Sequence, residues 1–142
     1  MSVFTIVMHK AYLSLGANIG DREHNIREAV LLLDSLAGHV TRVSSFLETE
    51  PWGFSSSHRF VNVCVCLMTS LSPMSLLKAT QNIESRLGRS AKSVEGRYED
   101  RVIDIDILLY DDLTVNLPEL QIPHPLMYER DFVMIPLREI LQ

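Results

Sequence analysis

Residues 60–68 read Phe-Val-Asn-Val-Cys-Val-Cys-Leu-Met, and this alternating stretch decides the fold that we predict. Successive side chains of a β-strand point to opposite faces, so the odd-numbered positions form one aliphatic face. Such a face is expected to pack into the core of a sheet as part of a central strand. The other face carries Phe60, Asn62, Cys64 and Cys66. No second cysteine or histidine pair stands at ligand spacing, which favours packed, reduced thiols over a metal site.

Turn and cap residues around this strand delimit the remaining elements. Ser72 and Pro73 are typical of a helix start and Gly88 of a helix end. Alternation and helical periodicity predict strands at 11–15, 40–48 and 102–110, helices at 22–36 and 73–87, and short helical pieces at 123–141.

The order of these elements is strand, helix, strand, strand, helix, strand. It predicts the ferredoxin-like α+β sandwich, an antiparallel sheet with helices packed on one face. We expect one domain over residues 1–142, since no repeat or low-complexity segment divides the chain.

The composition excludes several classes of protein. The 142 residues are 46% hydrophobic and 22% charged, with a net charge of -5, which disfavours binding to nucleic acid. No apolar stretch approaches the roughly 18 residues that span a bilayer. The short apolar run at residues 3–8 lacks a basic leader and a cleavage site. We therefore expect a cytoplasmic monomer with no membrane partner.

Asp104 and Asp106 stand two apart in the apolar strand 102–110, so both carboxylates share one face. Adjacent like charges repel, and a divalent cation between them relieves that repulsion. Hard oxygen ligands in this number suit Mg²⁺ that retains water and phosphate ligands. The alternative is a solvent-exposed face with two incidental aspartates.

A basic segment precedes the aspartates. Five of the thirteen lysines and arginines fall within sixteen positions, at Arg86, Arg89, Lys92, Arg97 and Arg101. Alone it would be a solvated loop, but phosphoryl-type transfer places metal ions and cationic side chains around the same phosphates. The chain has neither a Walker-A loop nor a kinase glycine loop, so side chains and metal would hold the phosphates.

Other polar residues leave two interpretations open. Phe60 with Asn62 offers a flat heteroaromatic ring an aromatic plane and an amide, or both residues belong to the core. His124 binds phosphate or shapes a turn between two prolines. Arg130 with Phe132 serves a site, or is a surface charge beside a core aromatic. The polar stretch 50–59 is typical of a ligand-covering loop.

Three segments together resemble the hydroxymethyl-dihydropterin pyrophosphokinase family. They are Leu-Ser-Leu-Gly-Ala-Asn at 13–18, Arg-Val-Ile-Asp-Ile-Asp-Ile-Leu-Leu at 101–109 and Pro-His-Pro at 123–125. The match spans nearly the whole chain. It implies a ferredoxin-like fold and transfer of pyrophosphate from ATP to the hydroxymethyl group of hydroxymethyl-dihydropterin in folate biosynthesis, with AMP as the other product.

The resemblance also implies roles for individual residues. Asp104 and Asp106 would hold two magnesium ions and act in catalysis with Arg89, Lys92 and Arg101. The residues at ATP would be Gln81, Glu84, Arg89, Lys92, Tyr98, Arg101, Ile107, His124 and Arg130. The pterin ring would lie between Phe60 and Phe132, its edges read by Asn62 and by groups near Thr49, Trp52 and Gly53.

The chain departs from the family pattern in two places. Glu99-Asp100 precede Arg101 where relatives commonly have a small residue, and Pro125 stands where some have an aromatic. One rival from another class is a ferredoxin-like module that binds RNA or a small molecule without catalysis. A second rival is a nucleotidyl or glycosyl transferase with an Asp-x-Asp motif. The reaction products distinguish the three.

Overall fold

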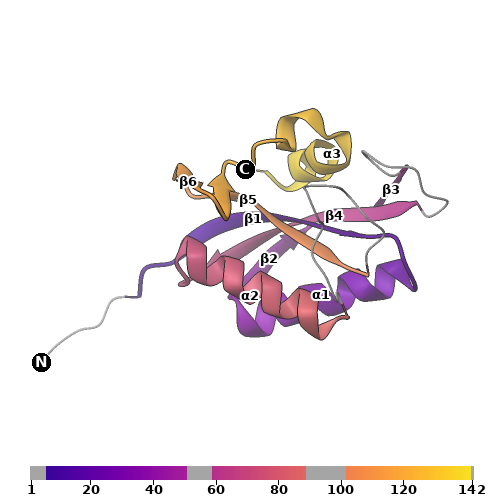
Figure 1. Cartoon of the computed structure of the whole chain (residues 1–142), viewed down its shortest axis with the longest axis horizontal. Helices are drawn as coiled ribbons and strands as arrows, with labels where there is room; N and C mark the ends of the chain where they lie inside the picture. Colours follow the sequence, from indigo (N-terminus) through magenta and orange to yellow (C-terminus); the bar gives the residue numbers. More distant parts are fainter. Residues whose placement is uncertain (1–5, 51–58, 89–101, 142) are drawn as a thin grey trace, which may run out of the picture.

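The computed structural model describes residues 6–50, 59–88 and 102–141, and its elements follow the predicted order (Figure 1). They are β1 His9–Ala17, α1 Arg22–Leu36, β2 His39–Val43, β3 Leu47–Thr49, β4 Phe60–Thr69, α2 Pro73–Arg86, β5 Asp104–Tyr110, β6 Val115–Leu117, β7 Leu120–Ile122, the 3₁₀ helix η2 Met127–Glu129 and α3 Asp131–Ile140. The single strand predicted at 40–48 is two strands, β2 and β3, and the β6–β7 hairpin was not predicted.

The main sheet has the strand order β2-β4-β1-β5, and β3 also pairs with β4. All of these pairs are antiparallel. With β2 and β3 counted as one interrupted strand, the order is the ferredoxin-like one, so the predicted fold class is confirmed. None of the helices in the described ranges is both long and apolar enough to cross a membrane.

Helices cover both faces of the sheet, α1 and α2 on one side and α3 on the other (Figure 1). The prediction that helices pack on one face therefore holds for α1 and α2 only. The odd-numbered aliphatic face of β4 lies in the core beneath α1 and α2. Cys64 and Cys66 are buried, unbridged and packed against α3, as the packed-thiol prediction required.

Local chemistry explains where the helices begin and end. The Ser72 hydroxyl accepts a hydrogen bond from the Ser75 amide at 3.2 Å, with Pro73 in the first helical turn, which confirms the predicted start. Gly38 follows the last residues of α1, and a Cβ there would stand 2.2 Å from the Met68 carbonyl oxygen. The glycine thus lets the chain pass closely over β4.

A β-bulge in β5 sets which side chains face which core. Leu13 pairs with Ile107 and Tyr12 with Leu109, so Leu108 is the extra residue. Before the bulge, alternate residues face the α1–α2 core, while the residues between them face the α3 side. After it, Tyr110 returns to the α1–α2 core.

Candidate active site

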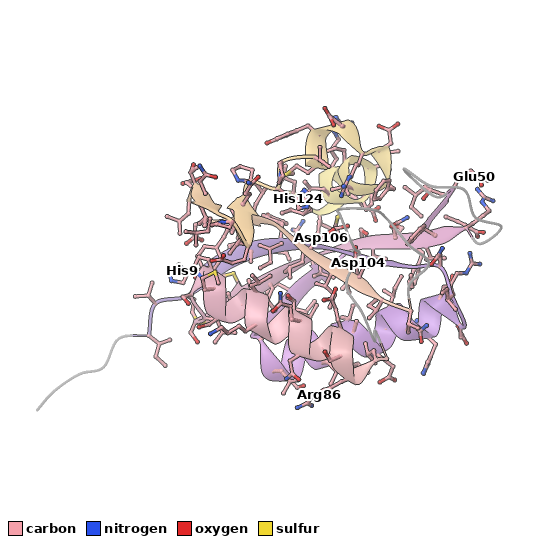
Figure 2. The ribbon with its side chains drawn as sticks, viewed as in Figure 1. His9, Glu50, Arg86, Asp104, Asp106 and His124 are labelled. Carbon is pink, nitrogen blue, oxygen red and sulfur yellow. The ribbon has the colours of Figure 1, made fainter. Side chains whose placement is uncertain are left out.

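Asp104 and Asp106 occupy the first and third positions of β5 and are half-buried. Between them Ile105 is buried in the α1–α2 core, so both carboxylates lie on the opposite, α3-covered face (Figure 2). The shared face predicted from their spacing is confirmed. Among the described residues no third acidic, histidine or cysteine side chain completes a metal-binding group. Two carboxylates match the protein share of a Mg²⁺ site whose other ligands are water and phosphate.

The strand register joins the acidic pair to the aromatic pair. Asp104 pairs with Gly16, and Gly16 pairs on its other side with Asn62. Neighbouring strands lie about 4.8 Å apart, so Asn62 lies about 10 Å across the sheet from Asp104. The residue between them in this row has no side chain.

Asn62 lies beside two other predicted site residues where β4 pairs with β3. Asn62 is 2% exposed, and its Nδ2 donates to the Thr49 Oγ1 at 3.0 Å. Phe60 is half-buried and pairs with Thr49 on β3. The structure thus brings these three predicted residues together. Two further predicted ring contacts, Trp52 and Gly53, lie outside the described residues.

Arg130 and Phe132 stand at the start of α3. The Arg130 guanidinium carbon lies 5.7 Å from the centroid of the Phe132 ring, a cation–π distance. Arg130 is 2% exposed, so the interpretation of it as a surface charge is wrong. Burial lowers the pKa of Arg130 to about 10, which still leaves it positively charged at neutral pH. The α3 side of the sheet therefore contains a buried cation.

His124 follows β7 and is fixed through its backbone and its ring. Its amide donates to the Leu108 carbonyl of β5 at 3.0 Å. Its Nδ1 accepts from the Leu126 amide at 3.3 Å, which places the proton of the neutral ring on Nε2. Burial lowers the pKa of His124, and the charge of Asp104 acts in the opposite direction. His124 therefore shapes the turn and also lies within electrostatic reach of the acidic pair (Figure 2).

A cleft of about 230 Å³ runs along the β5 edge, between α2 and the β6–β7 hairpin. Its wall combines the carboxylates of Asp106 and Glu119, the amide of Gln121 and one histidine with apolar side chains. The lining includes Leu77, Asp106, Ile107, Leu120, His124 and Pro125. Of the residues predicted at ATP, Ile107 and His124 are therefore found together in one cleft.

Glu84 near the end of α2 is a feature that sequence reasoning located only by resemblance. It is 6% exposed, and its Oε2 accepts a hydrogen bond from the Ile105 amide at 2.8 Å. The bond fixes the β5 backbone between the two aspartates. Gln81, three positions earlier, is half-buried. The basic residues Arg89, Lys92, Arg97 and Arg101, with Tyr98, lie outside the described residues.

Comparisons with known proteins show which family this chain resembles. Residues 12–142 match the family described as 7,8-dihydro-6-hydroxymethylpterin-pyrophosphokinase (HPPK). The chain is similar to the 2-amino-4-hydroxy-6-hydroxymethyldihydropteridine pyrophosphokinase of Porphyromonas gingivalis, with 49% identity over 130 residues, covering 91% of this chain and 88% of that protein. The Bacillus subtilis protein of the same name is 48% identical over 133 residues, covering 93% and 78%.

Some similar proteins are longer. The mitochondrial folate synthesis bifunctional protein of Pisum sativum is 42% identical over 130 residues, which cover 91% of this chain and 24% of that protein. The crystal structure of Plasmodium falciparum HPPK-DHPS wild type with pteroate superposes with a TM-score of 0.75 at 17% identity, covering 97% of this chain and 40% of that one. This structural likeness supports the fold.

Proposed function

The chain belongs to the 7,8-dihydro-6-hydroxymethylpterin-pyrophosphokinase family, and from this premise we propose that Asp104 and Asp106 hold the divalent metal of its reaction. The protein transfers pyrophosphate from ATP to hydroxymethyl-dihydropterin in folate biosynthesis. A binding module without catalysis is not favoured. The observation that supports our metal assignment is the pair of half-buried carboxylates on one face of β5.

The proposed metal is Mg²⁺, as two ions, because the donors are hard oxygens and the protein supplies only part of a coordination shell. When bound with ATP, magnesium neutralises charge on the phosphates. The half-buried position of the aspartates keeps bulk water partly away from the site, which strengthens their attraction for a cation. The α3 face thus offers negative groups to the metal and Arg130 to the phosphates.

For the acceptor, we propose that the pterin ring lies between Phe60 and Phe132. Asn62 supplies an amide to the polar edge of the ring, and its bond to Thr49 fixes the orientation of that amide. Asn62 and Asp104 lie about 10 Å apart in one row across the sheet. In this proposal, a ring held at Asn62 directs its hydroxymethyl group along that row, toward the two aspartates. Its oxygen attacks the β-phosphorus of ATP, the bond to the α-phosphate oxygen breaks, and AMP leaves.

For the nucleotide, we propose the cleft along the β5 edge. Its apolar wall at Leu77, Ile107 and Pro125 suits the flat face of a base, and Asp106, which also lines the cleft, would hold the metal near the phosphates. The basic residues at Arg89, Lys92 and Arg101 would complete the charge neutralisation. Catalysis then rests on positioning and charge, with no covalent intermediate, since the described site holds no activated nucleophile.

The test is an assay of products with wild type, Asp104→Asn and Asp106→Asn. Wild type should form AMP only when hydroxymethyl-dihydropterin is present, should stop when the metal is chelated and should recover with Mg²⁺. Each variant should lose about 10³-fold or more in kcat with an unchanged circular dichroism spectrum, because a neutral amide holds the cation poorly.

Asp112→Asn is the matched control, since Asp112 is an exposed aspartate in the turn after β5. It should keep wild-type activity. Formation of ADP would indicate an ordinary kinase, and full activity in both strand variants would remove the aspartates from the metal site. The monomeric, cytoplasmic and single-domain state stays a prediction, which sedimentation and fractionation would check.

A further inference from the structure

The backbone conformation at Gly16 in β1 does not require a glycine. Its φ lies outside the left-handed region, so other residues could adopt its conformation. What it lacks is space for a side chain. A Cβ at this position would stand 2.9 Å from the Asn62 Oδ1 and 3.5 Å from the Phe60 Cδ1.

Asn62 cannot easily move away from such a Cβ. Its backbone belongs to β4 and pairs with β1 on one side and β3 on the other. Its Nδ2 is held by the Thr49 hydroxyl at 3.0 Å, and the side chain is almost fully buried. To withdraw Oδ1, the amide must rotate and break the bond to Thr49, or tilt away from the sheet.

We propose that Gly16 is a positioning residue for the acceptor substrate. Without a side chain it lets the Asn62 carboxamide lie against β1 in the orientation that meets the polar edge of the ring. The inference rests on the proposed function, in which Phe60 and Asn62 hold the pterin.

A second glycine provides a contrast within the same sheet. At Gly38 the nearest atom to an added Cβ is the Met68 carbonyl oxygen at 2.2 Å, a backbone atom near the β2 edge. A clash there acts on the fold alone. At Gly16 the nearest atom is the end of a functional side chain, so the effect should fall on one ligand.

The experiment measures two affinities of Gly16→Ala by calorimetry. One is for a non-hydrolysable ATP analogue with Mg²⁺, and the other is for hydroxymethyl-dihydropterin in the presence of that analogue. We expect at least a tenfold loss of pterin affinity with nucleotide affinity within twofold of wild type. Gly38→Ala, the control, should lower the melting temperature and leave the ratio of the two affinities unchanged. Wild-type pterin affinity in Gly16→Ala, or an equal loss of both affinities, would overturn the inference.

A double-mutant cycle separates this inference from the proposed function. Asn62→Ala should lose pterin affinity by itself, and if it does not, the proposed ring site is wrong whatever Gly16 does. In the Asn62→Ala background the clash is absent, so Gly16→Ala should change pterin affinity by less than twofold. An equal loss in both backgrounds would show that Asn62 does not mediate the effect.

The double variant also decides the case in which Gly16→Ala alone does not fold. The inference then requires Gly16→Ala with Asn62→Ala to fold and to bind pterin as Asn62→Ala does. Failure of the double variant to fold would mean that the glycine serves the backbone only.

Discussion

The two edges of the sheet share one structural feature but differ in function. At each edge, a helix carboxylate accepts a hydrogen bond from a strand amide. At the β2 edge Asp34 of α1 accepts a hydrogen bond from the Val40 amide at 2.9 Å. At the β5 edge Glu84 of α2 accepts one from the Ile105 amide at 2.8 Å. Each carboxylate stands two residues before its helix ends, and each amide belongs to the second residue of its strand.

The edges differ in burial and in the connection that precedes the strand. Asp34 is exposed, whereas Glu84 is buried. Residues 37–38 link α1 to β2, but residues 87–103 link α2 to β5 and contain Arg89, Lys92 and Arg101. The α1–β2 link shows that two residues can join a helix to an edge strand of this sheet. The long basic link accompanies the edge strand that bears the aspartates.

The largest effect on activity should come from shortening the α2–β5 link until it resembles the α1–β2 link. Deleting residues 89–101 leaves four residues between α2 and β5, and the α1–β2 link shows that a short connection can join a helix to an edge strand. We expect a folded protein, because closing a shorter loop costs less entropy. Pyrophosphate transfer should fall by about 10³-fold or more, since the basic residues are gone.

Circular dichroism melting and the AMP assay measure the two outcomes of this deletion. A triple variant with Arg89, Lys92 and Arg101 each changed to Gln, at full link length, is the control for charge alone. An active deletion variant would show that the long link has no part in catalysis.

A smaller effect should distinguish the two carboxylates. Glu84→Ala leaves the buried Ile105 amide without its charged acceptor and should lower the free energy of unfolding by about 1–3 kcal/mol. Asp34→Ala exposes the Val40 amide to water and should lower it by less than about 1 kcal/mol. Urea unfolding measures both.

Activity adds a second readout to this pair. Glu84→Ala should also weaken the apparent Mg²⁺ affinity, because Ile105 lies between the two aspartates, while Asp34→Ala should not. Glu84→Gln retains an acceptor oxygen and should recover most of the stability. Equal losses from the two alanine variants would mean that burial does not set the difference.

The smallest expected effect is a dependence of folding stability on pH, caused by His124 beside β5. Burial lowers the pKa of His124 below its ordinary value of 6.5, so the fold favours the neutral ring. As the pH falls below about 6.5 the unfolded chain binds the proton first, and stability declines until the pH passes the lower folded-state pKa. Stability from this group is therefore fully present above the ordinary pKa.

His124→Asn removes the titration and keeps an acceptor for the Leu126 amide. Urea midpoints should fall less between about pH 7.5 and about pH 5.5 in this variant than in wild type, because the unfolded variant has no imidazole at this position to protonate. Parallel declines in the two proteins would show that other groups cause the acid sensitivity.

Alternation in the sequence predicts which side chains share a face, but it does not say what covers that face. It was sufficient for the central strand at residues 60–68 and for the shared face of Asp104 and Asp106. It could not show that α3 packs on Cys64 and Cys66, because that contact joins residues far apart in the chain.

Local breaks in the pattern explain the missed elements. The strand predicted at 40–48 is interrupted where the Ser44 hydroxyl accepts a hydrogen bond from the Cys64 amide at 2.9 Å. The β6–β7 hairpin has only three residues in each strand, and its two-residue turn, Pro118-Glu119, lacks the Asn-Gly or Asp-Gly pair that marks a hairpin in a sequence.

The candidate site shows the same limit of prediction from sequence periodicity. Spacing located the carboxylate pair, but the bond from Ile105 to Glu84 and the contact between Gly16 and Asn62 depend on strand order and register. Single-sequence periodicity carries no information about which strands become neighbours.

The extra residue at Leu108 divides β5 into two segments that can change independently. Asp104 and Asp106 precede the bulge, whereas Tyr110 follows it and donates a hydrogen bond to the Leu71 carbonyl on the opposite face. An engineer could therefore alter the acidic segment to accept another metal without redesigning the far end of the strand. The same bulge forbids sliding the acidic pair to positions 108 and 110, because those two side chains diverge to opposite cores.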